Sequence, residues 1–355
     1  MVKAHALVVL LSKGQIAVNM ARNMRLIDHS LRIFSTGNEL CIPLVRPIDN
    51  SESSRLSDTL GQIRVEEREF GERSQRARTL RGAVKDNLPP ELLAIVPKSF
   101  DVIGQIAIIE LPGQLVPFEE LIGAGVLEIC PNARTVMAKA GAFSSNYRTR
   151  ELRFIAGEDN SVTCYKEHGC TYELDVRKVF FSPRLGQERL RIACQVKPGE
   201  TVVDMFAGVG PYSILVARKQ PSSTVYAVDA NPAAFTFLVS NILANRVLGS
   251  VRPMMGDVRE VVKSHLFGVA DRLIMNLPGE ALSFVDVACS SLNERGGVIH
   301  FYSFESSEKP HEAASEKLKR QIDASGRELK SILAVRTVKE IAPYRFQVVV
   351  DARVS

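Results

Sequence analysis

The second half of the chain alternates between short apolar runs and amphipathic stretches. From about residue 180 onward, β-like segments such as TVVDMFA, TVYAVDA and DRLIMNLP are separated by helix-like segments such as PYSILVARK and AAFTFLVSNILANR. Strands that alternate with helices build parallel sheets with helices on both faces. The last two apolar runs are joined only by Ala-Pro-Tyr, which predicts a hairpin and one antiparallel strand. The pattern therefore predicts an α/β fold over residues 179–355, with a mostly parallel, Rossmann-like sheet.

Three other segments precede this predicted sheet. Residues 1–62 show a strand, helix and hairpin pattern, which predicts a small α+β module. Residues 63–84 are dense in charge and poor in apolar periodicity, so they are expected to contain a linker. Residues 85–178 contain short β-type runs such as FDVIGQIAIIEL and LRFIAGE, which predict a β-rich middle domain. A chain of 355 residues is long enough for this organisation.

Acidic residues end three successive strands of the predicted sheet. Asp204 ends the first strand and precedes a tight turn made by Gly208 and Gly210, whereas Asp229 and Asp257 end the next two strands. The carboxyl ends of parallel strands meet at one edge, where such folds bind their ligands. The third glycine of a dinucleotide site is missing, and the carboxylate of Asp204 would repel a pyrophosphate.

The three acids describe a ligand with a cation at one end and a nucleoside at the other. Asp204 suits an ammonium group, Asp229 the ribose hydroxyls, and Asp257 the adenine amino group. S-adenosylmethionine has this chemistry, and NAD does not. Any one of these aspartates would by itself be a common cap or turn residue. Their combination predicts an S-adenosylmethionine site. The other residues expected there are Phe206, Gly208 and Gly210.

The fourth strand ends in Asn276-Leu277-Pro278. Many enzymes that methylate planar nitrogens carry Asn or Asp, then Pro-Pro and an aromatic residue, at such a strand end. The amide faces the target nitrogen, and the aromatic ring stacks on a flipped base. Here Leu277 replaces one proline, and Gly279 cannot stack. The target is then held by other residues, or the segment is only a strand that runs into a turn stiffened by Pro278.

Charge, cysteine spacing and hydropathy limit the possible partners. The net charge is +5, which suits a polyanionic partner. No apolar run approaches the roughly 20 residues that a membrane-spanning helix needs, so no membrane partner is expected. The 6 cysteines form neither a CxxC pair nor a zinc spacing. We therefore expect reduced thiols, no bound metal and a cytoplasmic location.

Several segments together resemble the archaeal and eukaryotic type of tRNA guanosine-37 N1-methyltransferase. They are LPPELLAIVPKSFDVIGQIAIIEL, TVMAKAG, NYR with IAGE, VFFSPRLGQER, VVDMFAGVGPYSI and IMNLPGEALSF. Members of this family have Leu between Asn and Pro, so the NLP segment is regular for them. The resemblance covers most of the chain. It implies a class I methyltransferase sheet, S-adenosylmethionine as the cofactor, and tRNA bound at its anticodon loop and outer corner.

The resemblance also implies roles for single residues. The general base that takes the N1 proton of guanine matches Glu188, and the arginine that stabilises charge at O6 matches Arg148. Asn276 would orient the guanine edge. Arg184 and Phe180 match positions that wall the cofactor or target pocket, and Asn276, Pro278 and Arg184 are expected among the cofactor-binding residues. We expect a monomer that methylates N1 of guanosine 37 in tRNA by carboxylate general-base catalysis.

Three alternatives stay open on the sequence. One is a second activity, the methylation of carbon 7 of the wyosine precursor at the same tRNA position. Another is transfer of the aminocarboxypropyl group in the wybutosine pathway. The third is a non-catalytic tRNA-binding protein with the same fold. Against the third stands the combination of three acidic strand ends with Glu188 and Asn276.

Overall fold

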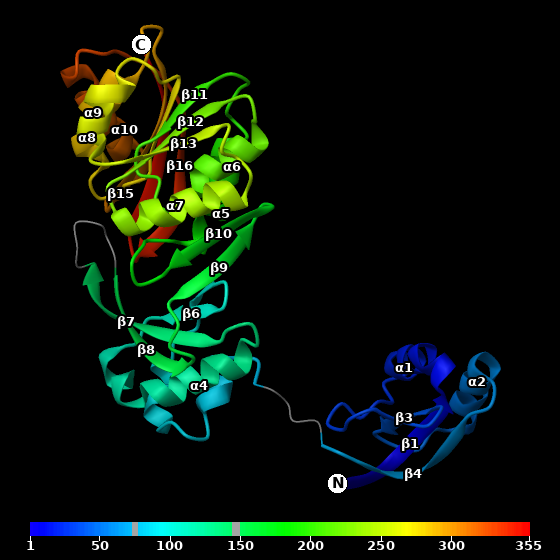
Figure 1. The fold of residues 1–355 in the computed structure, drawn as a ribbon. Helices are drawn as coiled ribbons and strands as arrows, with labels where there is room; N and C mark the ends of the chain where they lie inside the picture. Colours follow the sequence, from blue (N-terminus) through cyan, green and yellow to red (C-terminus); the bar gives the residue numbers. More distant parts are fainter. Residues whose placement is uncertain (73–76, 144–149) are drawn as a thin grey trace. The chain divides into compact units, whose positions relative to one another are not determined.

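The computed structural model describes residues 1–72, 77–143 and 150–355 (Figure 1). The chain divides into two compact units, Met1–Ala77 and Arg78–Ser355, which are described separately below.

The first unit is a four-stranded antiparallel sheet, in the order β2-β3-β1-β4, with two helices. The central strand β1 is buried on both sides because it carries the apolar run ALVV. Its residues Leu7 and Val9 pack against the helices, and Ala6 and Val8 pack on the opposite face. The elements are β1 (Val2–Leu10), η1 (Leu11–Lys13), α1 (Gly14–Asn23), β2 (Phe34–Thr36), β3 (Glu39–Leu44), α2 (Asn50–Leu60) and β4 (Arg64–Phe70).

The segment expected to contain a linker, residues 63–84, includes the boundary between the two units but is not a linker throughout. Its first part is strand β4, which pairs with β1 along the edge of the sheet from Arg64 to Phe70. Only Phe70 of this strand is fully buried. An edge strand that exposes charged side chains lacks the apolar alternation by which strands are predicted.

The second unit begins with a four-stranded sheet, in the order β5-β6-β7-β8, whose apolar face packs against α4 and neighbouring short helices. A two-stranded hairpin, β9 and β10, follows. The elements are α3 (Leu80–Val84), η2 (Pro90–Ile95), β5 (Asp101–Ile103), β6 (Ile106–Ile109), η3 (Gly113–Phe118), α4 (Glu119–Ile129), β7 (Thr135–Phe143), β8 (Arg150–Gly157), β9 (Val162–Glu167) and β10 (Cys170–Asp175).

The larger sheet of this unit has seven strands in the order β13-β12-β11-β14-β15-β17-β16. The elements are η4 (Pro183–Leu185), α5 (Gly186–Ala193), β11 (Thr201–Asp204), α6 (Pro211–Lys219), β12 (Thr224–Asp229), α7 (Pro232–Ala244), β13 (Val251–Met255), α8 (Val258–Val261), η5 (Val262–Leu266), β14 (Arg272–Met275), η6 (Ala281–Phe284), α9 (Val285–Ser291), β15 (Gly297–Glu305), α10 (Pro310–Ala324), β16 (Leu329–Ala342) and β17 (Arg345–Val354).

Strands β11 to β15 pair in parallel, and β17 is antiparallel to both of its neighbours. Helices α5, α6 and α7 cover one face, and α8, α9 and α10 cover the other (Figure 1). The predicted fold class, a mostly parallel α/β sheet with one antiparallel strand, is confirmed. The strand order reverses direction at β11, with β12 on one side and β14 on the other, and this is where ligands bind in such sheets.

The β9–β10 hairpin is attached to the large sheet through helix α7. The side-chain oxygen of Asn245 accepts a hydrogen bond from the backbone N–H of Thr171 at 2.9 Å, and that of Asn241 accepts one from Glu173 at 2.8 Å. The two side-chain amides thus bond backbone groups of β10 that a third strand beside the hairpin would otherwise pair with. The domain boundary expected between residues 178 and 179 therefore lies inside the second unit, close in sequence to the hairpin that is hydrogen-bonded to α7.

Candidate active site

The polar residues predicted at the strand ends lie at one edge of the seven-stranded sheet. Asp204 is the last residue of β11 and Asp229 the last residue of β12. Asp257 follows β13 and is the N-cap of α8, whereas Asn276 directly follows β14. Because these strands are parallel, their carboxyl ends share the same edge.

The carboxylate of Asp229 is tied to the glycine turn beside it. One oxygen accepts a hydrogen bond from the backbone N–H of Gly208 at 2.6 Å, and the other accepts one from Asn231 at 2.8 Å. Burial raises the pKa of this carboxyl above its ordinary value, although both hydrogen bonds oppose the shift. Asp229 is thereby fixed at the edge of the sheet, with acceptor positions left for hydroxyl groups of a ligand.

The glycines of the turn are required by its backbone conformation. Gly208 has φ 57° and Gly210 has φ 90°, a region that side chains rarely adopt. A Cβ on Gly210 would also lie 2.6 Å from Cδ1 of Leu238. Gly210 is the N-cap of α6, which begins at Pro211. The turn therefore brings bare backbone and a helix N-terminus close to Asp229.

Asp204 is fully buried, and its two carboxylate oxygens differ in their hydrogen bonding. Its Oδ2 accepts a hydrogen bond from the hydroxyl of Ser213 at 2.7 Å, while Oδ1 has no partner among the described residues. Burial raises the pKa of Asp204 to about 7, and the nearby carboxylate of Asp229 adds to the shift. A buried carboxylate oxygen at this sheet edge, without a partner in the described part of the chain, fits a ligand that brings a positive charge.

Asp257 and Phe206 lie in a more open part of the same edge. Asp257 is about half exposed and accepts a hydrogen bond from the backbone N–H of Arg259 at 2.8 Å, as expected of a helix cap. The guanidinium of Arg259 lies 3.8 Å from the ring centroid of Phe284, which in turn contacts Phe206 edge-on at 5.1 Å. Capping uses one oxygen of Asp257, and the other is 3.5 Å from Arg259.

Glu188 on α5 is buried and receives three hydrogen bonds. Its Oε1 accepts one from the hydroxyl of Tyr302 at 2.6 Å and one from Nη2 of Arg191 at 2.7 Å, and its Oε2 accepts one from Nε of Arg191 at 2.8 Å. Only 9% of the residue is exposed. The bidentate arginine compensates a carboxylate charge that would otherwise be costly to bury.

The guanidinium of Arg191 is itself held by a chain of buried polar groups. It donates to Asp351 on β17, whose other partner is the Nδ1–H of His300 at 2.6 Å. Burial alone would raise the pKa of Asp351, but hydrogen bonds from His300 and Arg191 hold it below its ordinary value. Burial lowers the pKa of His300 and so favours the neutral imidazole. With the ring proton on Nδ1, the Nε2 atom accepts a hydrogen bond from Nη1 of Arg272 at 2.8 Å.

The NLP segment is anchored on both sides. The backbone N–H of Phe304 on β15 donates to the carbonyl of Pro278 at 3.1 Å. Leu277 packs against the core on the α8–α10 side, where a second proline would fill less space. The side-chain oxygen of Asn276 accepts a hydrogen bond from Nε2 of Gln347 at 3.3 Å. Tyr302, Asp351 and Gln347 gave no distinct signal in the sequence.

Three further observations complete the comparison with the predicted site. Arg184 is half exposed and donates from Nε to Asp101 on β5 at 2.6 Å, so its guanidinium bonds the preceding sheet. Arg148 lies outside the described residues. Within residues 1–72, 77–143 and 150–355, no group of three or more His, Cys, Asp or Glu side chains could hold a metal ion.

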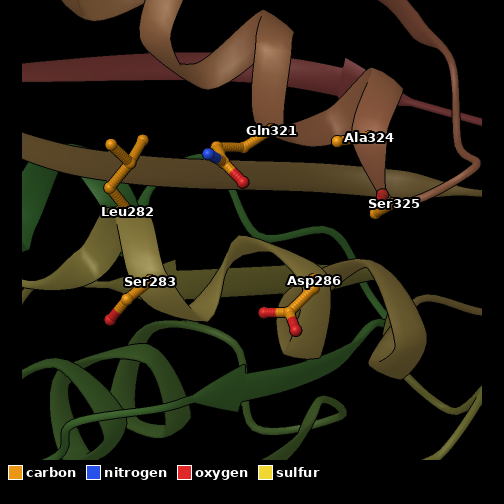
Figure 2. Close-up of a pocket in the computed structure, with 6 residues that line it drawn as sticks. All are labelled: Leu282, Ser283, Asp286, Gln321, Ala324 and Ser325. Atoms are coloured by element: carbon orange, nitrogen blue, oxygen red, sulfur yellow. The ribbon is translucent and has the colours of Figure 1, made fainter.

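A shallow hollow elsewhere on this unit does not coincide with the predicted site (Figure 2). It lies between η6 and α9 on one side and the end of α10 on the other, and it contains none of the predicted site residues. Its lining consists of Leu282, Ser283, Asp286, Gln321, Ala324 and Ser325. No helix of the described chain is long and apolar enough to cross a membrane.

The sheet order, the glycine turn and the acidic strand ends define a class I, S-adenosylmethionine-dependent methyltransferase. The TRM5/TYW2 methyltransferase domain matches residues 163–330, and the TYW2 N-terminal domain matches residues 80–160. The chain belongs to the TRM5/TYW2 methyltransferase family.

Individual relatives agree with this membership along the whole chain. The tRNA (guanine(37)-N(1))-methyltransferase Trm5b of Pyrococcus abyssi is 38% identical over 345 residues, which is 97% of each protein. The complex structure of aTrm5 and tRNALeu has a TM-score of 0.79 at 28% identity and covers 99% of both chains. TYW2 of P. horikoshii in complex with MeSAdo has a TM-score of 0.65 at 30% identity, covering 78% of this chain and 97% of that one.

S-adenosylmethionine is the cofactor of this enzyme. The orphaned oxygen of Asp204 fits its positive end, and the fixed carboxylate of Asp229 fits its ribose.

Proposed function

We propose that this enzyme transfers the methyl group of S-adenosylmethionine to N1 of guanosine 37 in the anticodon loop of tRNA. The observation that carries the proposal is the buried, hydrogen-bonded carboxylate of Glu188 on the same sheet face as Asn276. The similarity to Trm5b along nearly the whole chain supports the substrate.

The chemistry of guanine explains why a carboxylate is needed. Guanine N1 carries a proton at neutral pH, so its lone pair becomes available for methylation only when that proton leaves. Glu188 takes the proton as a general base while the methyl group transfers. S-adenosylmethionine supplies an activated methyl group when it is bound.

The proposed roles of the other residues follow from where charge develops and how the base is held. Asn276 orients the guanine edge through its side-chain amide. Arg148 stabilises the negative charge that grows on O6 as N1 loses its proton. The residue after Pro278 is Gly279, so the base is held by polar contacts and not by an aromatic ring at that position. Correct alignment of N1 with the methyl carbon should supply much of the rate.

Recognition of the tRNA itself requires contacts beyond one base. We propose that the first unit, Met1–Ala77, contacts the tRNA at its outer corner, and that the following β5–β8 sheet and the catalytic sheet hold the anticodon loop. The net charge of +5 is consistent with phosphate contacts. A cytoplasmic location and a monomeric state are part of the same proposal.

One experiment tests the reaction directly. The protein is incubated with methyl-labelled S-adenosylmethionine and tRNA transcripts that carry guanosine, adenosine or uridine at position 37. We expect label only in the guanosine transcript, and nucleoside mass spectrometry should identify 1-methylguanosine. A larger, aminocarboxypropyl-type product, or label that persists without guanosine 37, would overturn the proposal.

A related transfer on a modified base is the second candidate. The similarity to Taw21, a tRNA 4-demethylwyosine(37)-methyltransferase of Saccharolobus solfataricus, at 33% identity over 73% of this chain supports this candidate. A tRNA that carries the tricyclic wyosine precursor at position 37 should be included in the same assay. Methyl label in that tRNA in addition to the guanosine transcript would indicate dual specificity.

A further inference from the structure

The antiparallel strand β17 contributes two buried polar side chains to the catalytic face of the sheet. Along this strand, Gln347, Val349 and Asp351 alternate with residues that point to the other side, and Val349 lies in the core that α5 and α6 cover. Gln347 and Asp351 are each 2% exposed. Buried polar side chains inside a strand are costly unless they have specific partners, so their partners indicate what they do.

The partner of Gln347 is the amide of Asn276. Its Nε2 donates to Oδ1 of Asn276 at 3.3 Å, across a separation of 71 residues in the chain. A primary amide can present either its oxygen or its NH₂ group in a given direction. In the arrangement observed, Oδ1 of Asn276 is occupied by the donor Gln347, and the NH₂ group of Asn276 is left to face the target. Loss of Gln347 would remove this partner and leave the Asn276 amide less constrained.

The partner of Asp351 is the arginine that holds Glu188. Both carboxylate oxygens of Asp351 accept hydrogen bonds from Arg191, while Oδ1 also accepts from His300. Arg191 then donates to both oxygens of Glu188. Asp351 thus determines the position of the guanidinium that sets the orientation of the Glu188 carboxylate.

We propose that Gln347 and Asp351 of β17 are positioning residues for methyl transfer: Gln347 orients Asn276, and Asp351 orients Glu188 through Arg191. Neither side chain touches the target base or the cofactor; each acts through the residue that it holds. The inference rests on the proposed function, because it takes Asn276 and Glu188 as the groups that face guanine.

Gln347 is tested by a double-mutant cycle with Asn276. We expect Gln347→Leu to lower kcat for methyl transfer about tenfold, the effect of one lost hydrogen bond in the aligned complex. The affinity for S-adenosylmethionine, measured by calorimetry, should stay at the wild-type value. In an Asn276→Ala background the same change should cost less than twofold, since the group through which Gln347 acts is gone.

Asp351 is tested in the same way against Glu188. Asp351→Asn should lower kcat more than tenfold in the wild-type background and have little effect in a Glu188→Gln background. Because Asp351→Asn removes the anion beside His300 and one of the two anions beside Arg191, we expect this variant to lose stability. Asp351→Glu keeps the charge and should restore part of the rate. If both Asp351 variants fail to bind cofactor, the Gln347 cycle decides the proposal alone.

A control is available in Gln220, a glutamine of the same unit that follows α6 and is only partly buried. Its side chain donates to the carbonyl of Val196 at 3.5 Å and accepts from the hydroxyl of Ser222 at 3.1 Å, so it bonds none of the predicted site residues. Gln220→Leu should leave kcat, KM for tRNA and cofactor affinity unchanged.

The possible outcomes separate the two proposals. One outcome overturns the inference while the proposed function stands. In it, Asn276→Ala and Glu188→Gln both lose methyl transfer, but Gln347→Leu lowers kcat by the same factor in the wild-type and Asn276→Ala backgrounds, so β17 has only a structural role. If Asn276→Ala and Glu188→Gln transfer methyl groups at the wild-type rate, the residue roles in the proposed function fail, and the inference fails with them. A smaller effect of Gln347→Leu on kcat in the Asn276→Ala background than in the wild-type background supports the inference.

Discussion

Glu188 shows how hydrogen bonds can decide which part of a carboxylate is available for reaction. Each carboxylate oxygen can accept about two hydrogen bonds. Oε1 already accepts from Tyr302 and Arg191, whereas Oε2 accepts only from Arg191 among the described residues. The acceptor position that remains is therefore on Oε2, and it is this oxygen that we expect to take the N1 proton.

The first prediction concerns this oxygen. Glu188→Gln keeps the shape of the side chain but cannot take a proton, so methyl transfer should fall by about 10²- to 10⁴-fold. Cofactor affinity should remain close to wild type, because the residue does not contact the predicted cofactor acids. Calorimetry and single-turnover transfer on one preparation measure both quantities. Glu173→Gln, an exposed position on β10, is the control, and unchanged transfer in Glu188→Gln would remove the general-base role.

The second prediction follows from the buried carboxyl of Asp204. Its pKa is raised to about 7 in the folded protein, so between about pH 4 and 7 the folded state keeps a proton that the unfolded chain has lost. The free energy of unfolding should therefore fall as pH rises through this window. Asp204→Asn removes this contribution.

Thermal unfolding without cofactor at pH 5 and pH 8 measures the effect. The drop in Tm between these pH values should be smaller in Asp204→Asn than in wild type, by a few degrees. Equal drops in the two proteins would show that the Asp204 carboxyl is ionised in the folded state at pH 5. The same variant should bind S-adenosylmethionine more weakly, because the orphaned oxygen no longer carries a charge.

At the scale of elements, the predictable features are those in which a polar residue ends an apolar run. Asp204 and Asp229 end strands of four and six residues, and Asn276 follows a strand of four, so their common edge follows from the alternation of strands and helices. Gln347 and Asp351 lie within the run RFQVVVDARV, and their partners are 71 and 160 residues earlier in the chain. Their contacts depend on the pairing of β17 with β15, which no local pattern specifies.

Burial of charged residues was equally hidden from the sequence. Glu188 and Arg191 are three residues apart on α5, a spacing typical of an exposed ion pair on a helix. The pair is buried only because β15 and β17 provide Tyr302 and Asp351 beside it. Strand β4 is the opposite case. It is a regular strand, but its exposed charged residues give it the sequence pattern of a linker.

The third prediction tests the turn between β11 and α6. Gly210→Ala would force a side chain into φ 90° and bring its Cβ to 2.6 Å from Leu238. We expect a lower Tm and cofactor affinity at least about tenfold weaker, because the start of α6 must shift. Gly199→Ala is the control: its φ is 77°, but no atom lies within 4 Å of the added Cβ. That variant should lose some stability and keep its cofactor affinity.

At the scale of the whole molecule, two units with separate cores share one chain. The core of the first unit is formed by β1, β3 and its two helices, and the second unit contains every described residue of the predicted site. Cofactor binding and tRNA binding should therefore be separable. The charged segment near residue 77 connects two folded bodies, whichever way they are oriented.

The fourth prediction separates these two functions. A protein made of residues 78–355 should bind S-adenosylmethionine with the affinity of the full chain but bind tRNA more weakly. Its dependence of log Kd on log salt concentration should also be shallower, because fewer phosphate contacts are made. Calorimetry and filter binding at several salt concentrations measure the two effects. Equal salt slopes for both proteins would remove the first unit from the tRNA interface.

The position of β17 has a consequence for the synthesis of the protein. This strand follows every other element of the large sheet in the chain but lies between β15 and β16. A nascent chain that ends before Arg345 has the predicted cofactor acids, Asn276 and Glu188, but not the strand that we propose orients Asn276 and Glu188. It also leaves the edges of β15 and β16 unpaired, which invites association with other chains. The residues expected to bind the cofactor are therefore synthesised before the strand on which the proposed positioning of Asn276 and Glu188 depends.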